Sequence, residues 1–272
     1  MRALRAGLGP GQRRRFSSLV RSALAARLRD MRVFLPNAVQ VDAITAAKSG
    51  DDVLCVAQTG SGKTLCFLLP LIETLLDDPR AHGLVVAPSR ELAIQHADIA
   101  ERLISDLPGA PAVRLLPDAP SRADAATRLV IAQPDDALTL LQNAPAASFP
   151  TTVAIDEVDE VLCGGQYEAT LSPRGAALLD ALGGVTRGGV DPKGPEGATA
   201  PRGRTLRAST ETSPPQYLLT TAHLARAHQK VLSERFGDAV RVQQRKGGGG
   251  DNAALVPTLR QVGAPCLSYA CK

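Results

Sequence analysis

Eight residues, 57–64 (AQTGSGKT), restrict the folds open to this chain more than any other feature of its sequence. They follow a short apolar run at 53–57 and precede a longer apolar run at 65–76, which suit a strand and a helix respectively. A glycine-rich loop that joins a strand to a helix is the local structure of a phosphate-binding loop. The alternative is a glycine-rich turn that only connects the two elements.

The residue types inside this loop fit phosphate and metal chemistry. Gly60 and Gly62 allow backbone N–H groups to turn toward phosphate oxygens, and the start of the helix adds unpaired N–H groups. Lys63 can reach the β- and γ-phosphates as a point charge, and the Thr64 hydroxyl can ligate Mg²⁺. The loop therefore predicts a site for a nucleoside triphosphate.

A second motif supplies the carboxylates that such a site needs. Residues 152–155 form an apolar run that ends at Asp156 and Glu157. Asp156 would hold Mg²⁺, and Glu157 would orient or deprotonate the attacking water. An acidic helix start is the alternative, because the helix dipole favours carboxylates there.

Apolar runs suited to strands alternate with helical patterns along the chain. The expected strand and helix pairs are 53–57 with 63–77, 83–87 with 89–105, 129–132 with 134–142, 152–156 with 158–162, and 217–221 with 224–236. A series of this kind predicts an α/β fold with a parallel, doubly wound sheet and helices on both faces. The motifs fall at the carboxyl ends of strands, where such sheets bind ligands.

Together these motifs resemble those of the DEAD-box family of ATP-dependent RNA helicases. The matching stretches are 36–40 (PNAVQ), the phosphate loop at 57–64, 87–93 (APSRELA), 156–159 (DEVD) and 218–224 (LLTTAHL). Phe16 lies 24 residues before Gln40, near the position of the family's upstream phenylalanine. The resemblance implies a single RecA-like P-loop domain and, in the complete enzyme, ATP hydrolysis coupled to remodelling of RNA duplexes. It also implies ATP, Mg²⁺ and RNA as ligands, together with helicase-associated proteins.

The resemblance assigns a role to each matching position. Gln40 reads adenine, Lys63 and Glu157 serve catalysis, and Thr64 and Asp156 hold the metal. RNA would be held through its phosphates and sugars rather than through its bases. The remaining nucleotide contacts are Ala57, Thr59, Gly60, Ser61 and Gly62; the RNA contacts are Pro88, Ser89, Arg90 and Glu91; and the coupling residues are Asp159, Thr221 and His223.

Several positions depart from the family pattern. Asp135 and Asp136 replace a glycine and an arginine that face the RNA backbone, so we expect weakened RNA binding. The family's double glycine is missing at 116–120 (LPDAP), and Val33 stands where an aromatic side chain often stacks on adenine. A second RecA-like domain, which carries arginine fingers in the family, would follow a linker-like segment at 247–272 and is not in the sequence.

Three functions stay open at this point. The first is an organellar ATP-dependent RNA helicase, represented by its N-terminal half. The second is a non-catalytic module that binds ATP or a partner protein, which the departures favour. The third is a normal helicase whose sequence is truncated here. Because the arginine fingers lie in the second domain, we expect little ATPase activity from these 272 residues alone.

The positive charge gathers at the N-terminus. Residues 1–29 contain eight arginines and no acid, which exceeds the net charge of +4 and leaves the rest of the chain net negative. An Arg-rich, acid-free start predicts a transit peptide and a mitochondrial location. A chloroplast is the second choice, and a basic tail on a cytoplasmic or nuclear protein is the alternative.

The remaining regions set the expected domain limits. The RecA-like domain is expected at 30–246, interrupted at 183–215 by a disordered Gly/Pro-rich insertion that is a solvated loop or, alternatively, an arm that touches RNA. No run approaches 18 apolar residues, so no membrane span is expected. The five cysteines lack the pattern of a disulfide framework or a zinc site, which favours a reducing compartment.

Overall fold

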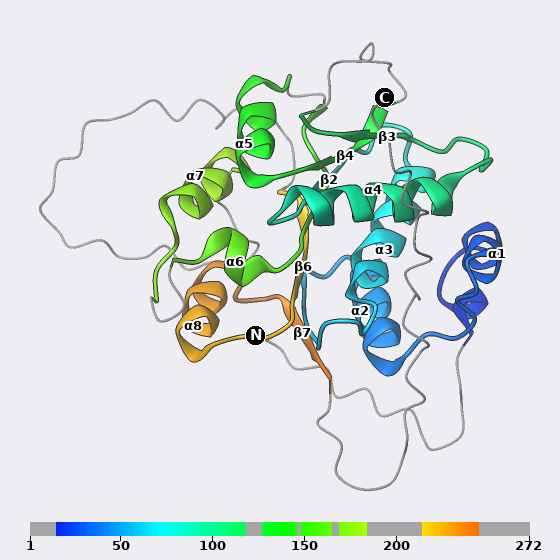
Figure 1. The fold of residues 1–272 in the computed structure, drawn as a ribbon, viewed down its shortest axis with the longest axis horizontal. Helices are drawn as coiled ribbons and strands as arrows, with labels where there is room; N and C mark the ends of the chain where they lie inside the picture. The colour runs from blue at the N-terminus through cyan, green and yellow to red at the C-terminus, as the bar shows by residue number, and fades with distance from the viewer. Residues whose placement is uncertain (1–14, 118–126, 146–147, 165–168, 184–213, 245–272) are drawn as a thin grey trace, which may run out of the picture.

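Seven parallel strands form one twisted sheet at the centre of the protein (Figure 1). The structure is a computed structural model that describes residues 15–117, 127–145, 148–164, 169–183 and 214–244. The strand order is β3-β4-β2-β5-β6-β1-β7, and every neighbouring pair is parallel. The strands are β1 (Val53–Val56), β2 (Gly83–Val86), β3 (Ala112–Leu115), β4 (Thr127–Ala132), β5 (Thr152–Ile155), β6 (Gln216–Thr221) and β7 (Val240–Gln243).

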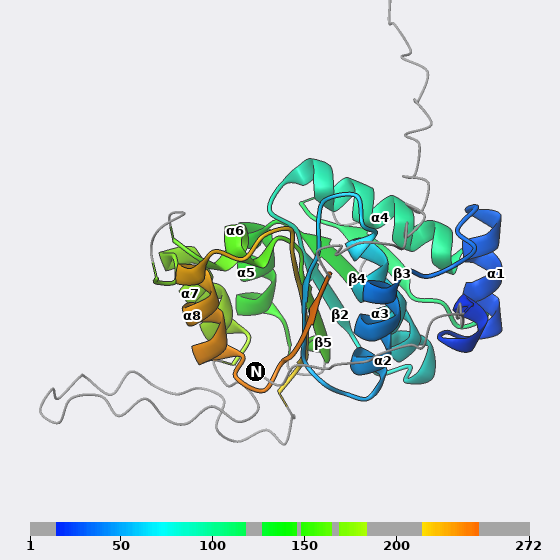
Figure 2. The same cartoon turned by 90° about the horizontal axis from the view of Figure 1, so that it is seen from below.

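Helices cover both faces of this sheet, so the predicted doubly wound α/β fold is confirmed (Figure 2). In that view α1 to α4 lie on one side of the strands and α5 to α8 on the other. The helical segments are η1 (Phe16–Ser18), α1 (Ser22–Asp30), α2 (Ala38–Lys48), α3 (Lys63–Asp77), α4 (Arg90–Ile104), α5 (Pro134–Asn143), α6 (Val158–Leu162), α7 (Pro173–Ala181) and α8 (Arg226–Arg235). All five strand and helix pairs expected from the sequence are present, with ends that differ by one or two residues.

The alternation of side chains along the strands divides the interior into two hydrophobic cores. On β1, Val53 and Cys55 pack into the core under α2, α3 and α4, whereas Leu54 and Val56 pack into the core under α5 to α8. All four side chains are buried. A strand buried on both faces needs a continuous apolar run, which is why β1, β2 and β5 could be recognised in the sequence.

The edge strands β3 and β7 and the helical segments η1, α1, α2 and α7 were not predicted. β3 has Arg114 in its middle and is only partly buried, and β7 alternates apolar and polar residues over four positions. Edge strands are buried less completely, so neither shows a continuous apolar run. α7 is marked by its Ser172 cap, whose hydroxyl accepts a hydrogen bond from Gly175 N, and by Pro173 in its first turn.

Part of the segment predicted as a leader is packed against the domain. Phe16, Leu24 and Leu28 are at most 2% exposed and belong to the core that lies under α2 to α4. The folded part of the chain therefore starts before residue 30, at the latest with η1. Residues 1–14, most of the predicted insertion (184–213) and the tail from 245 onward lie outside the described residues.

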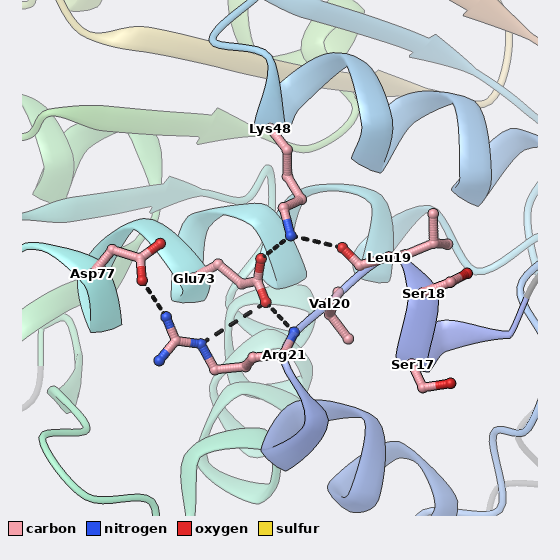
Figure 3. A pocket seen from close by; sticks show the side chains of 8 residues that line it. All are labelled: Ser17, Ser18, Leu19, Val20, Arg21, Lys48, Glu73 and Asp77. Carbon is pink, nitrogen blue, oxygen red and sulfur yellow. Dashed lines mark hydrogen bonds and ion pairs between the residues drawn. The ribbon is translucent and has the colours of Figure 1, made fainter.

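A buried carboxylate anchors this N-terminal segment to α2 and α3 (Figure 3). Glu73 on α3 accepts hydrogen bonds from Arg21 N and forms an ion pair with Lys48, whose Nζ also donates to Leu19 O at 2.7 Å. The Arg21 guanidinium pairs with Asp77, one helical turn beyond Glu73. Because the Glu73 side chain is only 7% exposed, its charge needs these partners. The four charged residues that line the open pocket between these elements, Arg21, Lys48, Glu73 and Asp77, form ion pairs with one another.

Among the described residues, no helix combines the length and the apolar character that a bilayer crossing needs.

Candidate functional site

Three neighbouring strands bring the main motifs to one edge of the sheet. β5, β6 and β1 lie side by side, and their registers pair Ile155 with Leu219 and Val56 with Thr221. The carboxyl ends of parallel strands meet at the same edge. Consequently the phosphate loop after β1, the acidic pair after β5 and the end of β6 meet in space although they lie far apart in sequence.

The phosphate loop has the backbone that its glycines were expected to allow. Gly60 and Gly62 have φ angles of +79° and +77°, in the left-handed region that glycine adopts without a steric penalty. Gly62 is the N-cap of α3, so the loop opens directly into the helix start. The Ser61 hydroxyl is buried and has no hydrogen-bond partner among the described residues. An unsatisfied buried hydroxyl inside such a loop fits a ligand with acceptor oxygens.

Lys63 points back toward the loop and the acidic pair. Its Nζ lies 3.0 Å from Ala57 O and 3.3 Å from Glu157 Oε1, and its side chain is 8% exposed. A phosphate group bound in the loop would compete with both oxygens for this ammonium. Ala57 is buried, whereas Thr59 and Gly60 are exposed and Thr64 is half-buried.

Asp156 is held by donors from three separate elements. His96 Nε2 on α4 lies 2.9 Å from Oδ2, while the Thr220 hydroxyl on β6 and Glu157 N both donate to Oδ1. Burial alone would raise the pKa of Asp156, but the hydrogen bond and charge of His96, the Thr220 hydroxyl and the Lys63 charge lower it below its ordinary value. The carboxylate is therefore ionised at neutral pH.

Glu157 and the end of β6 are tied together next to this carboxylate. Glu157 has a φ of +44°, and its Oε2 accepts a hydrogen bond from Ala222 N at 2.8 Å. The Thr221 hydroxyl donates to Asp159 Oδ1 at 2.7 Å. The predicted coupling residues Asp159 and Thr221 are thus in contact, whereas the His223 side chain is exposed and only its backbone joins this cluster.

Gln40 joins α2 to the phosphate loop. Asn37 and Gln40 form a reciprocal capping box, in which Asn37 N donates to Gln40 Oε1 and Gln40 N donates to Asn37 Oδ1. Gln40 Nε2 also donates to Gly62 O at 3.1 Å, and Asn37 Nδ2 donates to Ser61 O at 2.7 Å. Gln40 is 2% exposed. The predicted adenine reader therefore also fixes the conformation of the loop.

The residues predicted to contact RNA lie at the start of α4. Pro88 and Ser89 are half-buried, with Ser89 as the N-cap that accepts from Leu92 N, while Arg90 and Glu91 are exposed in the first turn. Hydrogen bonds from the backbone N–H of Glu91 and from the Ser89 hydroxyl lower the pKa of the Glu91 carboxyl below its ordinary value.

The two acids that depart from the family pattern occupy a helix start. Asp135 and Asp136 lie in the first turn of α5, where the helix dipole favours negative charge. Asp135 Oδ1 is 2.9 Å from Arg174 Nε on α7, and both side chains are mostly exposed. The Arg174 guanidinium offsets part of the negative charge of Asp135. The sequence could not predict this contact, because Arg174 lies on α7, which was not predicted.

No role was predicted for His96. It is 2% exposed, and its Nε2 lies 2.9 Å from Asp156 Oδ2. Its position beyond the 87–93 motif, on the inward side of an amphipathic helix, was the only available signal. A contact between residues 60 positions apart cannot be read from helical periodicity.

The residues present fit a divalent cation together with a nucleoside triphosphate. Asp156 offers an ionised, buried carboxylate, and Thr64 directly follows Lys63 in the first turn of α3. Hard oxygen donors of this kind are those that Mg²⁺ prefers, with the remaining positions taken by water and phosphate. Among the described residues, no group of three or more His, Cys, Asp or Glu side chains is placed to hold a metal ion.

Comparison with known proteins identifies the family of this chain. The profile of the DEAD/DEAH box helicase family matches residues 37–172, half of the chain. The chain is similar to the ATP-dependent rRNA helicase RRP3 of Phaeosphaeria nodorum, 34% identical over 46% of this chain and 24% of that protein. It is also similar to the probable ATP-dependent RNA helicase DDX59 of Mus musculus, 35% identical over 50% of this chain and 23% of that protein. The matched region thus spans about a quarter of these relatives.

Solved structures show the same fold. A DEAD box protein from the hyperthermophile Methanococcus jannaschii superposes with a TM-score of 0.58 at 20% identity and covers 83% of this chain and 54% of that one. A Dbp5 variant from S. cerevisiae, bound to RNA and ADP BeF3, superposes with a TM-score of 0.62 at 17% identity over 85% of this chain and 52% of that one. The predicted RecA-like architecture is therefore confirmed, and the chain belongs to the DEAD/DEAH box helicase family.

Proposed function

We propose that this chain is the ATP-binding half of an ATP-dependent RNA helicase, whose ATP hydrolysis is coupled to remodelling of RNA. The observation that carries the proposal is the convergence of Lys63, Asp156 and Glu157 at the mouth of the phosphate loop. The names of the relatives RRP3 and DDX59 support the same assignment. A glycine-rich turn that only connects a strand to a helix does not require a buried lysine and two carboxylates beside it.

The chain's own residues divide the chemistry among them. The loop N–H groups and Lys63 would bind the phosphates, and Thr64 and Asp156 would hold Mg²⁺, which neutralises phosphate charge when bound. Glu157 Oε1 faces Lys63, while Oε2 is fixed by Ala222 N. When phosphate draws Lys63 away, Glu157 Oε1 is left free to orient a water or accept its proton.

Adenine selection is proposed for Gln40. Its amide has two N–H donors and an oxygen with two lone pairs. Within the protein, Gln40 Nε2 donates one N–H to Gly62 O, and Gln40 Oε1 accepts from Asn37 N. One N–H donor and one oxygen lone pair of the amide are therefore left for a ligand. A donor beside an acceptor complements the adenine edge and mispairs with guanine.

RNA is proposed to bind along the start of α4, through Arg90 and the helix N-terminus. Asp135 and Asp136 reduce this affinity, but the Arg174 side chain offsets part of their charge. Helicase-associated proteins stay proposed partners.

A mitochondrial location also stays a proposal, and it rests on the arginines of residues 1–29. Phe16 and Leu24 are buried in the core, so removing them would expose apolar surface. We propose that cleavage of a transit peptide, where it occurs, falls before Phe16.

Lys63→Ala tests the nucleotide site. Loss of a charge-assisted contact costs about 1.5–3 kcal/mol, so ATP affinity should fall roughly 10- to 100-fold. The measurement is displacement of a fluorescent ATP analogue, with circular dichroism to show that the variant is folded. Lys230→Ala, which removes an exposed lysine on α8, is the matched control and should leave affinity unchanged. Equal ATP binding by Lys63→Ala and the unaltered chain would refute the assignment of this loop.

A further inference from the structure

His96 lies behind the acidic pair rather than among the residues that face a nucleotide. It projects inward from α4, and its ring packs edge-on against Phe67 of α3, with centroids 5.3 Å apart and planes at 86°. Both side chains are almost fully buried. The packing leaves the imidazole little rotational freedom and aims Nε2 at Asp156 Oδ2, 2.9 Å away.

The chemistry of the pair fixes the direction of this hydrogen bond. An ionised carboxylate only accepts, so Nε2 carries the proton and donates. Nδ1 is buried and has no hydrogen-bond partner among the described residues. The polar function of His96 is therefore directed to Asp156 alone.

The donors around Asp156 leave one direction open. Each carboxylate oxygen has two lone pairs. Oδ1 accepts from the Thr220 hydroxyl and from Glu157 N, which fills it. Oδ2 accepts from His96 only, so a single acceptor position remains there among the described contacts.

We propose that His96 is a positioning residue that holds the Asp156 carboxylate so that the second lone pair of Oδ2 stays available to Mg²⁺ in the proposed ATP site. The inference rests on the proposed ATP site. It adds a residue on α4, the same helix whose first turn is proposed to touch RNA, so α4 would join the RNA contact to the metal ligand through one rigid element. Residues that orient a metal ligand commonly change metal affinity by about 10- to 100-fold when removed.

The test compares the gain in ATP affinity on adding Mg²⁺ among variants of the full chain. Calorimetric titrations with ATP are run once with EDTA and once with saturating Mg²⁺. In His96→Leu, which has similar bulk but no donor, the gain should fall about tenfold, while affinity in EDTA stays unchanged. In His96→Gln, the side-chain amide of glutamine is about as long as the imidazole and can still donate an N–H to Asp156. This variant should therefore keep most of the gain in ATP affinity that Mg²⁺ gives.

A control separates positioning from general loss of stability. Leu103→Ala removes a buried side chain from the same helix without touching Asp156, so it should lower the unfolding temperature and leave the Mg²⁺ gain intact. An undiminished gain in His96→Leu, or a gain lost equally in His96→Gln, would overturn the role of His96 alone. Absence of ATP binding by the unaltered chain under both conditions would overturn the proposed ATP site and, with it, this inference.

Discussion

Gly175→Ala should destabilise the protein by about 3 kcal/mol, because α7 approaches the backbone of α6 too closely for a side chain. A Cβ at this position would lie 2.2 Å from Leu162 O and 2.7 Å from its carbonyl carbon and Cα. These are backbone atoms, and Leu162 O already accepts hydrogen bonds from Ser172 N and Oγ. Either α7 moves outward or α6, which begins directly after Glu157, moves toward the site.

The free energy of unfolding measured in urea tests this expectation. Gly237→Ala is the matched control, since its Cβ would lie 3.3 Å from the nearest atom, Ser233 O, and a small shift relieves that contact. We expect the control to change stability by less than about 1 kcal/mol. Equal stabilities of the two variants would show that α6 and α7 are not packed as described.

Gly62→Ala should cost about 3 kcal/mol of stability and lower ATP affinity more than tenfold, because it disturbs both the loop and Gln40. The φ of +77° costs an L-residue about 1–2 kcal/mol. The added Cβ would lie 2.5 Å from Gln40 Nε2, so the buried amide must leave its two hydrogen bonds, worth about 1 kcal/mol each.

Gly60→Ala provides the control inside the same loop. Its φ of +79° imposes the same conformational cost, but a Cβ there meets nothing within 4 Å. Denaturant unfolding of both variants isolates the contribution of Gln40 as their difference, about 2 kcal/mol. If the two variants were equally stable, Gln40 would not support the loop.

The parts of this structure that were predictable are those with strong local signals. β1, β2 and β5 are buried on both faces and carry continuous apolar runs, so they could be identified from sequence. β3 and β7 lie at the sheet edges, and each contains an arginine that interrupts its apolar residues, so neither was predicted.

The site shows the same division between local and tertiary signals. Lys63, Asp156 and Glu157 lie in two motifs that are each continuous in sequence. The residue types in these motifs predicted that the three side chains share one site, as they do in the structure. The contacts of His96 with Asp156 and of Arg174 with Asp135 join segments that meet only through the topology of the sheet and its covering helices. The burial of part of the segment predicted as a leader, 1–29, was not predicted. Its many arginines drew attention away from the apolar stripe of Leu24, Ala25 and Leu28, which is buried in the structure.

We propose that this chain holds an adenine-selective nucleotide site at the carboxyl ends of β1, β5 and β6. The decisive measurement is calorimetric titration of the unaltered chain with Mg·ATP and, separately, with Mg·GTP. We expect saturable one-site binding of ATP and at least tenfold weaker binding of GTP, which corresponds to about 1.4 kcal/mol of discrimination by the remaining Gln40 donor and acceptor. Equal affinities for the two nucleotides, or no saturable binding of ATP, would contradict it.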